Sequence, residues 1–328
     1  MKIYLKGYYW YKNFGDELLL FGVIEEIFSR YTVEELVIEV GDTNRIKERV
    51  SKNIPFLKKF YHTKEINVDW GKVYYFNTEE YFKNKQFWFS KFLPKKRNTY
   101  IHIILGKHPF RKYFKIFGGW EVIDETRYFP HNWRNLILLY TKSILNENFA
   151  LWWGLGSQKS LLTRWLTNLL VHKANHLLLR ETHSLHICQH ILRKKCQKTE
   201  LHHDFSLDLI HYRKSQNTIS SNNFILINLS PSLNSKKRWK IKEKRKDRDL
   251  IYFPCDLNFD LKNITDKMTV RKQDQIFIWT NYKIETIFET LNKCSEGIGS
   301  RLHFLYCLQQ LWKKITPLSN NSKITYNL

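Results

Sequence analysis

The residues best suited to chemistry lie near the C-terminal end of the sequence, in Gly297–His303, which reads Gly-Ile-Gly-Ser-Arg-Leu-His. Its two glycines allow a sharp backbone turn, Ser300 can cap a helix, and the apolar residues that follow are typical of a buried helix. We therefore expect Arg301 and His303 in the first turn of a helix, whose free N–H groups and positive dipole end favour an anion. The segment predicts a site for a phosphorylated substrate. The alternative is a glycine-rich turn with a surface arginine and a packed histidine.

The composition indicates a protein that attracts anions. The chain has 328 residues, which suggests two domains of ordinary size, and 43% of them are hydrophobic, enough to build cores. Lys and Arg number 54 against 31 Asp and Glu, a formal net charge of +23. Such an excess favours a phosphorylated substrate, an acidic glycan, an anionic membrane surface or nucleic acid as partner.

Cysteine usage and hydropathy point to the cytoplasm. The five cysteines form no C-x-x-C pair, as is typical of a reduced, cytosolic protein. No apolar run reaches the length of a membrane span, and Met1–Lys6 is interrupted too early for a signal peptide. We expect a cytoplasmic protein, with peripheral contact to the inner face of the membrane left open.

The N-terminal segment predicts the opening of a parallel α/β sheet. The expected elements are a strand at Ile3–Leu5, a loop at Gly7–Gly15, a helix at Asp16–Arg30 and a strand at Leu36–Val40. Ligands of such sheets collect at the carboxyl ends of the strands. Asn13, Asp16 and Glu17 are expected there.

The rest of the chain repeats this alternation. Further strands are expected at Val73–Phe76, Ile101–Leu105, Phe149–Trp153, Leu177–Leu179, Phe224–Leu229, Leu250–Phe253 and Gln275–Trp279, and helices at Leu161–Val171, Ile284–Leu291 and Phe304–Trp312. The polar segment Arg213–Asn223 is the best linker candidate. We therefore expect an N-terminal domain at residues 1–212, a linker at 213–223 and a C-terminal domain at 224–328.

Other polar clusters carry weaker signals. His186 and His190 are spaced to share a helix face, but there is no H-E-x-x-H motif, so packed or surface histidines are favoured and no metal site is expected. Asp204 is interpreted either as a residue facing a cleft or as a solvated loop residue. No G-x-x-x-x-G-K-[ST] or complete G-x-G-x-x-G is present, which argues against nucleotide-binding loops of those kinds.

Several motifs occur in one order along nearly the whole chain. They are Gly7-x-x-Trp10-x-x-Asn13-x-Gly15-Asp16-Glu17, Gly118-Gly119, Gly154-Leu155-Gly156, Arg180-Glu181-x-x-Ser184, Asp204, Gly299-Ser300-Arg301-Leu302-His303 and Lys323-Ile324. This ordered set resembles the polysaccharide pyruvyl transferase family. The resemblance implies an α/β fold of two Rossmann-like domains in a GT-B-like arrangement with an interdomain cleft. It also implies transfer of an enolpyruvyl-derived group from phosphoenolpyruvate to a sugar, giving a pyruvate ketal. Trp10 and Trp120 depart from the family, which has glycine at both positions.

This chemistry needs cations for the donor and a source of protons. We expect the donor phosphate to be bound by Arg301 and Lys323, together with the helix N-terminus that follows Gly299. A guanidinium suits this role because it can donate two parallel hydrogen bonds to a phosphate. His303 would be the general acid, because an imidazole titrates near neutral pH; the resemblance implies proton transfer at this position too. Arg180 would hold the donor carboxylate.

The acceptor sugar needs different groups. Asp16, Glu17 or Asp204 would accept a proton from the sugar hydroxyl or hydrogen-bond its neighbours, and Asn13 is a candidate for sugar contacts. For all three carboxylates the alternative is a cap or a solvated side chain. No cofactor is expected besides phosphoenolpyruvate as donor substrate, and the acceptor is a saccharide, free or lipid-linked.

Three rival functions remain open at this point. A GT-B-like glycosyltransferase would use the same fold and bind a nucleotide-sugar. A nucleic-acid-binding module fits the charge and the aromatic residues, but the basic residues are dispersed and no RNA or DNA motif is present, so no nucleic acid is expected. A catalytically inactive relative would act as a scaffold in envelope assembly.

Overall fold

The computed structural model describes residues 1–7, 9, 12–83, 108–118, 148–155, 159–180, 182–191, 199–216, 224–229, 248–267 and 272–318. The chain forms two compact units. Unit 1 comprises Met1–Trp10, Leu19–Lys47 and Glu65–Phe205, and unit 2 comprises Tyr11–Leu18, Glu48–Lys64 and Ser206–Leu328. Residues 213–216 of the predicted linker form the end of helix α8 (Leu207–Gln216), and residues 217–223 lie outside the described ranges. The predicted domain boundaries stay a prediction.

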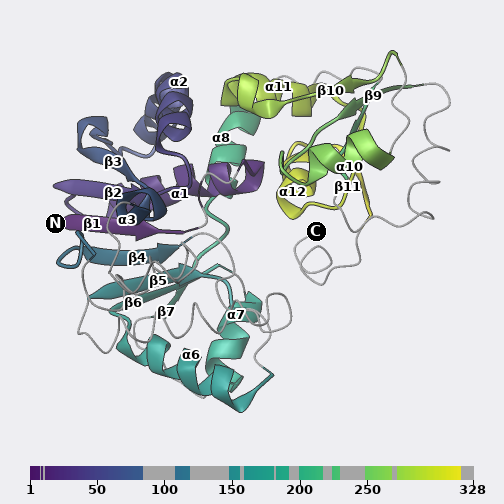
Figure 1. Cartoon of the computed structure of the whole chain (residues 1–328). Coiled ribbons are helices and arrows are strands. Elements are labelled where there is room, and N and C mark those ends of the chain that lie inside the picture. Colours follow the sequence, from purple (N-terminus) through teal and green to yellow (C-terminus); the bar gives the residue numbers. More distant parts are fainter. Residues whose placement is uncertain are drawn as a thin grey trace. The chain divides into compact units, whose positions relative to one another are not determined.

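Unit 1 is built on a sheet with the strand order β3-β2-β1-β4-β5-β6-β7 (Figure 1). Its strands are β1 (Lys2–Lys6), β2 (Glu35–Glu39), β3 (Val73–Phe76), β4 (Phe114–Gly118), β5 (Phe149–Trp153), β6 (His176–Leu179) and β7 (Thr199–Leu201). All neighbouring strands run parallel. The strand order reverses between β1 and β4, and ligands of open parallel sheets bind at the carboxyl ends of the strands at such a reversal.

Helices cover both faces of this sheet. Among the described residues, the helices with residues in unit 1 are α1 (Phe14–Arg30), α2 (Thr43–His62), α3 (Thr78–Lys83), α6 (Leu161–Lys173) and α7 (Thr182–His186). Leu151 of β5 belongs to a buried cluster with Leu166 and Leu170 of α6. Side chains alternate along a strand, so Trp152 faces the other way, where its ring stacks on Phe205. A sheet apolar on both faces is typical of the α/β class.

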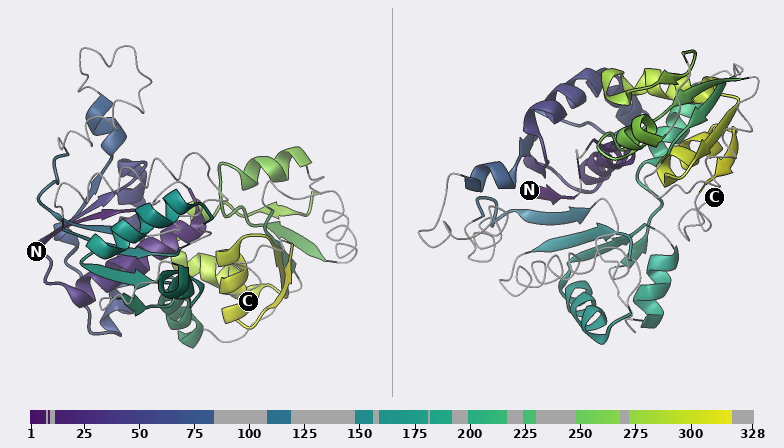
Figure 2. Two further views of the ribbon diagram at one scale, coloured as in Figure 1. Left: turned by 90° about the horizontal axis from the view of Figure 1, so that it is seen from below. Right: turned by 45° about the vertical axis from the view of Figure 1, so that its right-hand side comes forward.

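Unit 2 holds a smaller sheet with the strand order β10-β9-β8-β11-β12. Its strands are β8 (Phe224–Ile227), β9 (Asp249–Tyr252), β10 (Gln275–Ile276), β11 (Glu296–Gly299) and β12 (Lys314–Pro317), all parallel to their neighbours. Beyond residue 205, its helices within the described ranges are α8, α10 (Asp260–Lys267), α11 (Ile284–Lys293) and α12 (Leu302–Gln310). Helices α10 and α12 lie on opposite sides of the sheet (Figure 2, left). The strand order reverses between β8 and β11.

The glycines of the C-terminal motif lie inside a strand. Gly297 and Gly299 belong to β11, which corrects the expectation that they form a sharp turn. A Cβ added at Gly299 would come within 2.8 Å of Phe304 Cδ1, and one at Gly297 would overlap the side chain of Leu308. Both neighbours belong to α12. The glycines are therefore needed because α12 packs directly on the strand.

Most of the predicted elements are present. The α/β class is confirmed by the two parallel sheets, and β3 has the predicted bounds Val73–Phe76. The strand expected at Gln275–Trp279 ends at Ile276, and a 3₁₀ turn begins at Trp279. Helix α2 was not predicted, and the strand expected at Ile101–Leu105 lies outside the described residues. In the part of the chain that the structure describes, no helix is long and apolar enough to cross a bilayer.

Candidate functional site

The first element of the site is the N-terminus of α12 in unit 2. The helix begins at Leu302, directly after β11, and Arg301 occupies the cap position with an extended backbone. The Arg301 N–H donates to Asn228 Oδ1 at 3.2 Å. The Arg301 side chain makes no capping hydrogen bond, and the capping role suggested for Ser300 stays a prediction. His303 lies in the first turn as expected, and Arg301 precedes that turn as the cap residue.

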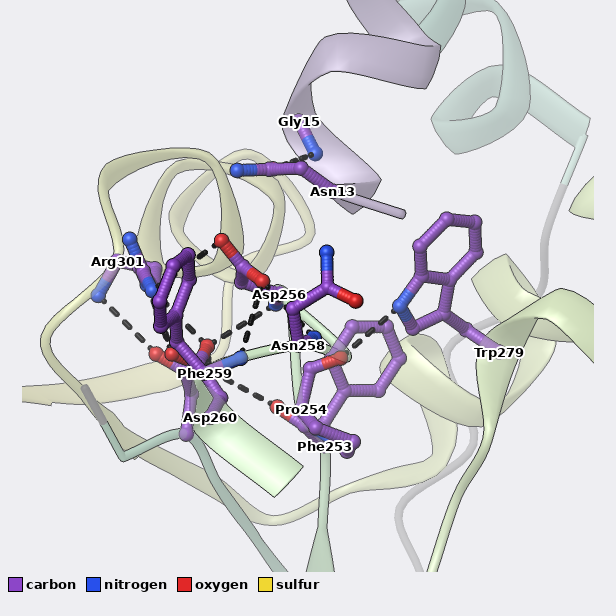
Figure 3. A network of polar contacts seen from close by, with 11 residues as sticks. Asn13, Gly15, Phe253, Pro254, Asp256, Asn258, Phe259, Asp260, Trp279 and Arg301 are labelled. Carbon is purple, nitrogen blue, oxygen red and sulfur yellow. Dashed lines mark hydrogen bonds and ion pairs between the residues drawn. The ribbon is translucent and has the colours of Figure 1, made fainter. Parts of the chain in front are cut away.

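A buried carboxylate orients the guanidinium of Arg301. Asp260, which is completely buried, accepts from Arg301 Nε at 3.2 Å and from Nη2 at 2.5 Å, as Figure 3 shows. Burial alone would lower the pKa of Arg301, but the hydrogen bonds and charge of Asp260 outweigh burial and raise it. The arginine side chain is 25% exposed. The guanidinium is thus charged, held in one orientation and still within reach of solvent.

Asp260 also organises the loop before α10. Its carboxylate accepts from Asn228 Nδ2 and from the Asp256 N–H, each at 3.1 Å. Asp256 in turn accepts from the N–H groups of Asn258 at 3.0 Å and Phe259 at 3.2 Å, an Asx-type turn (Figure 3). Burial raises the pKa of Asp256, and Asp260 adds to this rise while Arg301 opposes it. The ends of β8, β9 and β11 therefore share one hydrogen-bonded network.

The start of α1, which belongs to unit 2, pairs with this loop. Asn13 forms an antiparallel bridge with Asp256, and the Phe14 N–H donates to the Cys255 carbonyl at 2.8 Å. The Asn13 side chain caps α1, because its Oδ1 accepts the N–H of Gly15 at 3.0 Å. Asn13 therefore has a structural role at the helix start, and its predicted sugar contact stays a prediction.

His303 lies over the first turn of α1. A Cβ added at Gly15 would come within 2.7 Å of His303 Cγ and closer still to Nδ1. The histidine is buried. Only glycine leaves room for the imidazole at this position, so the N-termini of α1 and α12 meet at His303. Both ends attract anions for the same physical reason, their free N–H groups and helix dipoles.

The two first-turn carboxylates of α1 are buried in unit 2. Glu17 Oε1 accepts from Arg49 Nε at 2.7 Å, and Arg49 also donates to the Tyr282 carbonyl and lies over the ring of Trp279. Burial raises the pKa of Glu17, and the charge and hydrogen bond of Arg49 oppose this rise. Asp16 is buried beside it. The structure thus gives Glu17 an internal partner, while its predicted role in substrate binding stays a prediction.

Two other predicted residues lie together in unit 1. Arg180 Nη1 is 3.5 Å from Asp204 Oδ2, and both side chains are nearly buried. The predicted residues thus form two groups, one in each unit. The group in unit 2 consists of Asn13, Asp16, Glu17, Gly299, Arg301 and His303. Lys323, Trp10 and Trp120 lie outside the described residues.

The histidines between residues 172 and 190 include His176, His183 and His186 among those that the structure describes. His176 pairs with Glu200 at 3.0 Å, and His183 and His186 are exposed on α7. Over the described ranges, no group of three or more His, Cys, Asp or Glu side chains is placed to hold a metal ion.

The sequence interpretation missed four residues of the unit 2 network, Arg49, Asn228, Asp256 and Asp260. A signal existed for three of them. Asn228 follows the apolar strand β8, and Asp256 and Asp260 follow β9, positions where parallel sheets present ligand-binding side chains. Arg49 had no comparable signal, because it lies in the middle of a polar helix.

Comparison with solved structures supports the fold. The UDP-GlcNAc 2-epimerase of Neisseria meningitidis, bound to UDP-GlcNAc, matches with a TM-score of 0.61 and 10% identity over 100% of this chain and 85% of that one. The UDP-GlcNAc 2-epimerase of Rickettsia bellii matches with a TM-score of 0.57 and 9% identity, over 98% of this chain and 79% of that one. The enzyme of Methanocaldococcus jannaschii, in complex with UDP-GlcNAc and UDP, matches with a TM-score of 0.54 and 12% identity, over 98% of this chain and 85% of that one. At these identities the likeness shows the fold alone, and the predicted GT-B-like fold class is confirmed.

Sequence comparison is more specific. No curated protein matches the chain. A family model described as polysaccharide pyruvyl transferase matches residues 13–307, which include Asn13 at the start of α1, Asp260, and both Arg301 and His303. The match covers most of the chain and runs through every element of the unit 2 network. The chain therefore belongs to the polysaccharide pyruvyl transferase family.

Proposed function

We propose that this protein transfers the pyruvyl group of phosphoenolpyruvate to a saccharide and forms a pyruvate ketal. Membership of a transferase family supports the reaction type. The observation that carries the proposal is the pairing, at one helix N-terminus, of an oriented guanidinium with an imidazole. Arg301 is held by Asp260, and His303 lies over Gly15. A phosphorylated enol needs this combination of a cation and a proton source.

Arg301 would bind the donor phosphate. The Nε and Nη2 groups of Arg301 donate hydrogen bonds to Asp260, while Nη1 of Arg301 makes no hydrogen bond to any described residue. An anion could therefore approach from the Nη1 side and also meet the N-terminus of α12. Lys323 is proposed as a second phosphate ligand, and Arg180 as the ligand of the donor carboxylate.

His303 would supply the proton. In the proposed reaction the imidazolium protonates C3 of the enol while a sugar hydroxyl forms a bond to C2 and loses its proton. Phosphate then leaves with the electrons of its C2–O bond, and a second hydroxyl of the same sugar attacks C2 and closes the ketal ring. The products are the ketal and inorganic phosphate. Asp16 and Asp204 are the proposed acceptors of the hydroxyl protons.

The test is release of inorganic phosphate from phosphoenolpyruvate in the presence of saccharide acceptors. With an accepted sugar, His303→Ala should lower the rate of phosphate release by about 10²–10⁴-fold, the range typical of lost general acid–base catalysis. His211→Ala is the matched control, because His211 lies on the exposed side of α8, where it hydrogen-bonds Gln310. Full turnover by His303→Ala would remove this histidine from the mechanism.

A thermal-shift experiment separates the rival ligands. Phosphoenolpyruvate should raise the melting temperature of the wild-type protein, and Arg301→Lys should reduce this shift, because a planar fork becomes a point charge. Stabilisation by nucleotide-sugars and none by phosphoenolpyruvate would instead favour a glycosyltransferase. Stabilisation by short oligonucleotides alone would favour nucleic-acid binding.

A further inference from the structure

Helix α6 of unit 1 is apolar on the side that faces solvent. Leu161 is 80% exposed, Leu162 41% and Trp165 53%. These side chains lie within one arc of the helix, because residues three or four apart share a face. The opposite arc is already packed on the sheet through Leu166 and Leu170. A helix that is apolar on both sides is typical of a helix covered by a second surface.

The charged residues of α6 and its flanking segments have one sign. The sequence has no Asp or Glu between Phe149 and Arg180. Lys159, Arg164 and Lys173 are exposed at the two ends and along the side of α6. A helix face that combines exposed leucine and tryptophan with lysine and arginine, in a segment whose sequence carries no acid, is complementary to a partner that is both apolar and anionic.

We propose that this face of α6 docks on a bilayer that contains anionic lipids. Leu161, Leu162 and Trp165 would enter the boundary between headgroups and acyl chains, where tryptophan is favoured. The basic side chains would lie at the level of the lipid phosphates. The inference goes beyond the proposed reaction, since it concerns where the protein binds and needs no catalytic residue. A short interfacial helix predicts reversible binding that weakens with salt.

The experiment is co-sedimentation of the full chain with lipid vesicles, without donor or acceptor. Wild-type protein should bind vesicles of phosphatidylcholine mixed with phosphatidylglycerol, and bind pure phosphatidylcholine at least about tenfold more weakly, because each basic residue near an anionic surface favours binding. The double variant Leu161→Ser/Trp165→Ser should lose about tenfold or more in partitioning. The double variant Arg164→Glu/Lys173→Glu should lose binding to the mixed vesicles.

Matched controls use exposed residues elsewhere. Trp312→Ser removes a tryptophan that is 76% exposed in unit 2, and Lys58→Glu/Lys262→Glu makes the same charge change on α2 and α10. Both should bind like wild type. Thermal melts would establish that every variant is folded, as expected for substitutions of exposed side chains.

Three results would overturn the proposal. They are absence of binding by wild type, equal binding to neutral and anionic vesicles, and equal losses in patch and control variants. A dimer that Leu161→Ser/Trp165→Ser dissociates, without vesicle binding by wild type, would assign the face to a second copy of the chain. Because no phosphoenolpyruvate is present, failure here is distinguishable from failure of the proposed transfer reaction.

Discussion

The two sheets reverse strand order at equivalent places and use them differently. In unit 1 the reversal lies between β1 and β4, where Gly7 follows β1 and Gly118 ends β4. The buried ring of Tyr9 packs against both glycines: a Cβ at Gly7 would come within 2.6 Å of its Cζ, and a Cβ at Gly118 within 3.0 Å of its hydroxyl oxygen. An aromatic side chain of the protein thus takes up space beside this reversal.

In unit 2 the corresponding position, between β8 and β11, is lined by charged and amide groups. Asn228 follows β8, Arg301 follows β11, and Asp260 binds both. The topology is shared, so it cannot explain the difference. The comparison shows that a strand reversal provides a location, and that the residues placed there decide whether it can hold an anion.

The largest expected difference in activity is between two variants, each with one residue substituted at one of the two strand-order reversals. Arg301→Lys should lower kcat/KM for phosphoenolpyruvate by about 10²–10³-fold, because it removes the oriented guanidinium that we propose stabilises developing negative charge. Tyr9→Phe should stay within about threefold, because it keeps the aromatic ring that packs against Gly7 and Gly118. Steady-state phosphate release would measure both.

The Arg301→Lys variant keeps a positive charge beside Asp260, so the buried carboxylate is not left alone. A melting temperature near that of wild type would show that the kinetic loss is local. If Tyr9→Phe lowered kcat/KM as much as Arg301→Lys, this would contradict the claim that the two reversals are used differently.

A smaller loss of activity is expected from a substitution in the first turn of α1, next to His303. Gly15→Ala adds a methyl group at the position of the His303 imidazole and should displace it. Misplacing a catalytic group by about 1 Å can lower turnover by about a hundredfold, so we expect a fall in kcat of about tenfold to a hundredfold.

The control for Gly15→Ala is Gly71→Ala, which adds a methyl group whose nearest neighbour is Asp69 Oδ1, 3.2 Å away. Its kcat should match that of wild type. A Gly15→Ala enzyme with unchanged kcat would show that the imidazole position over α1 does not matter for turnover.

The smallest effect tests whether an ion pair of unit 1 serves stability alone. Burial opposes the charged form of Glu26, but hydrogen bonds from His202 and Arg30 prevail and lower the pKa of Glu26 to about 2. Burial likewise opposes His202⁺, and the hydrogen bond to Glu26 outweighs it and raises the pKa of His202 above 6.5. The Glu26–His202 pair should therefore make its full contribution to the free energy of unfolding between about pH 4.5 and 6.5. This contribution should be lost as pH rises through the raised pKa of His202, and also as pH falls toward the lowered pKa of Glu26.

Urea unfolding of wild type and His202→Ala measures this contribution. The difference in free energy of unfolding should be larger by about 1 kcal/mol at about pH 5.5 than at about pH 9. Turnover of the variant should be close to that of wild type. A stability difference that is constant, or that grows with pH, would contradict the assignment.

The sequence predicted those features that depend on neighbours along the chain. The period of apolar residues located α1, α6 and most strands, and the change from strand to helix located Arg301 and His303. Asp260 has a sequence signal in its position after β9, but its partner could not be predicted, because Arg301 is 41 positions away. The turn expected at Gly297 was wrong because the reason for that glycine is the side chain of Leu308 on α12, which only the folded sheet brings into contact.

The absence of side chains at Gly297 and Gly299 has a consequence for variation within the family. Because α12 rests directly on the backbone of β11, any larger residue there would lift the whole helix. The guanidinium and the imidazole at its first turn would then shift together and could not be adjusted one at a time. We therefore expect new acceptor preferences to arise through substitutions in surrounding loops, with this strand–helix contact left unchanged.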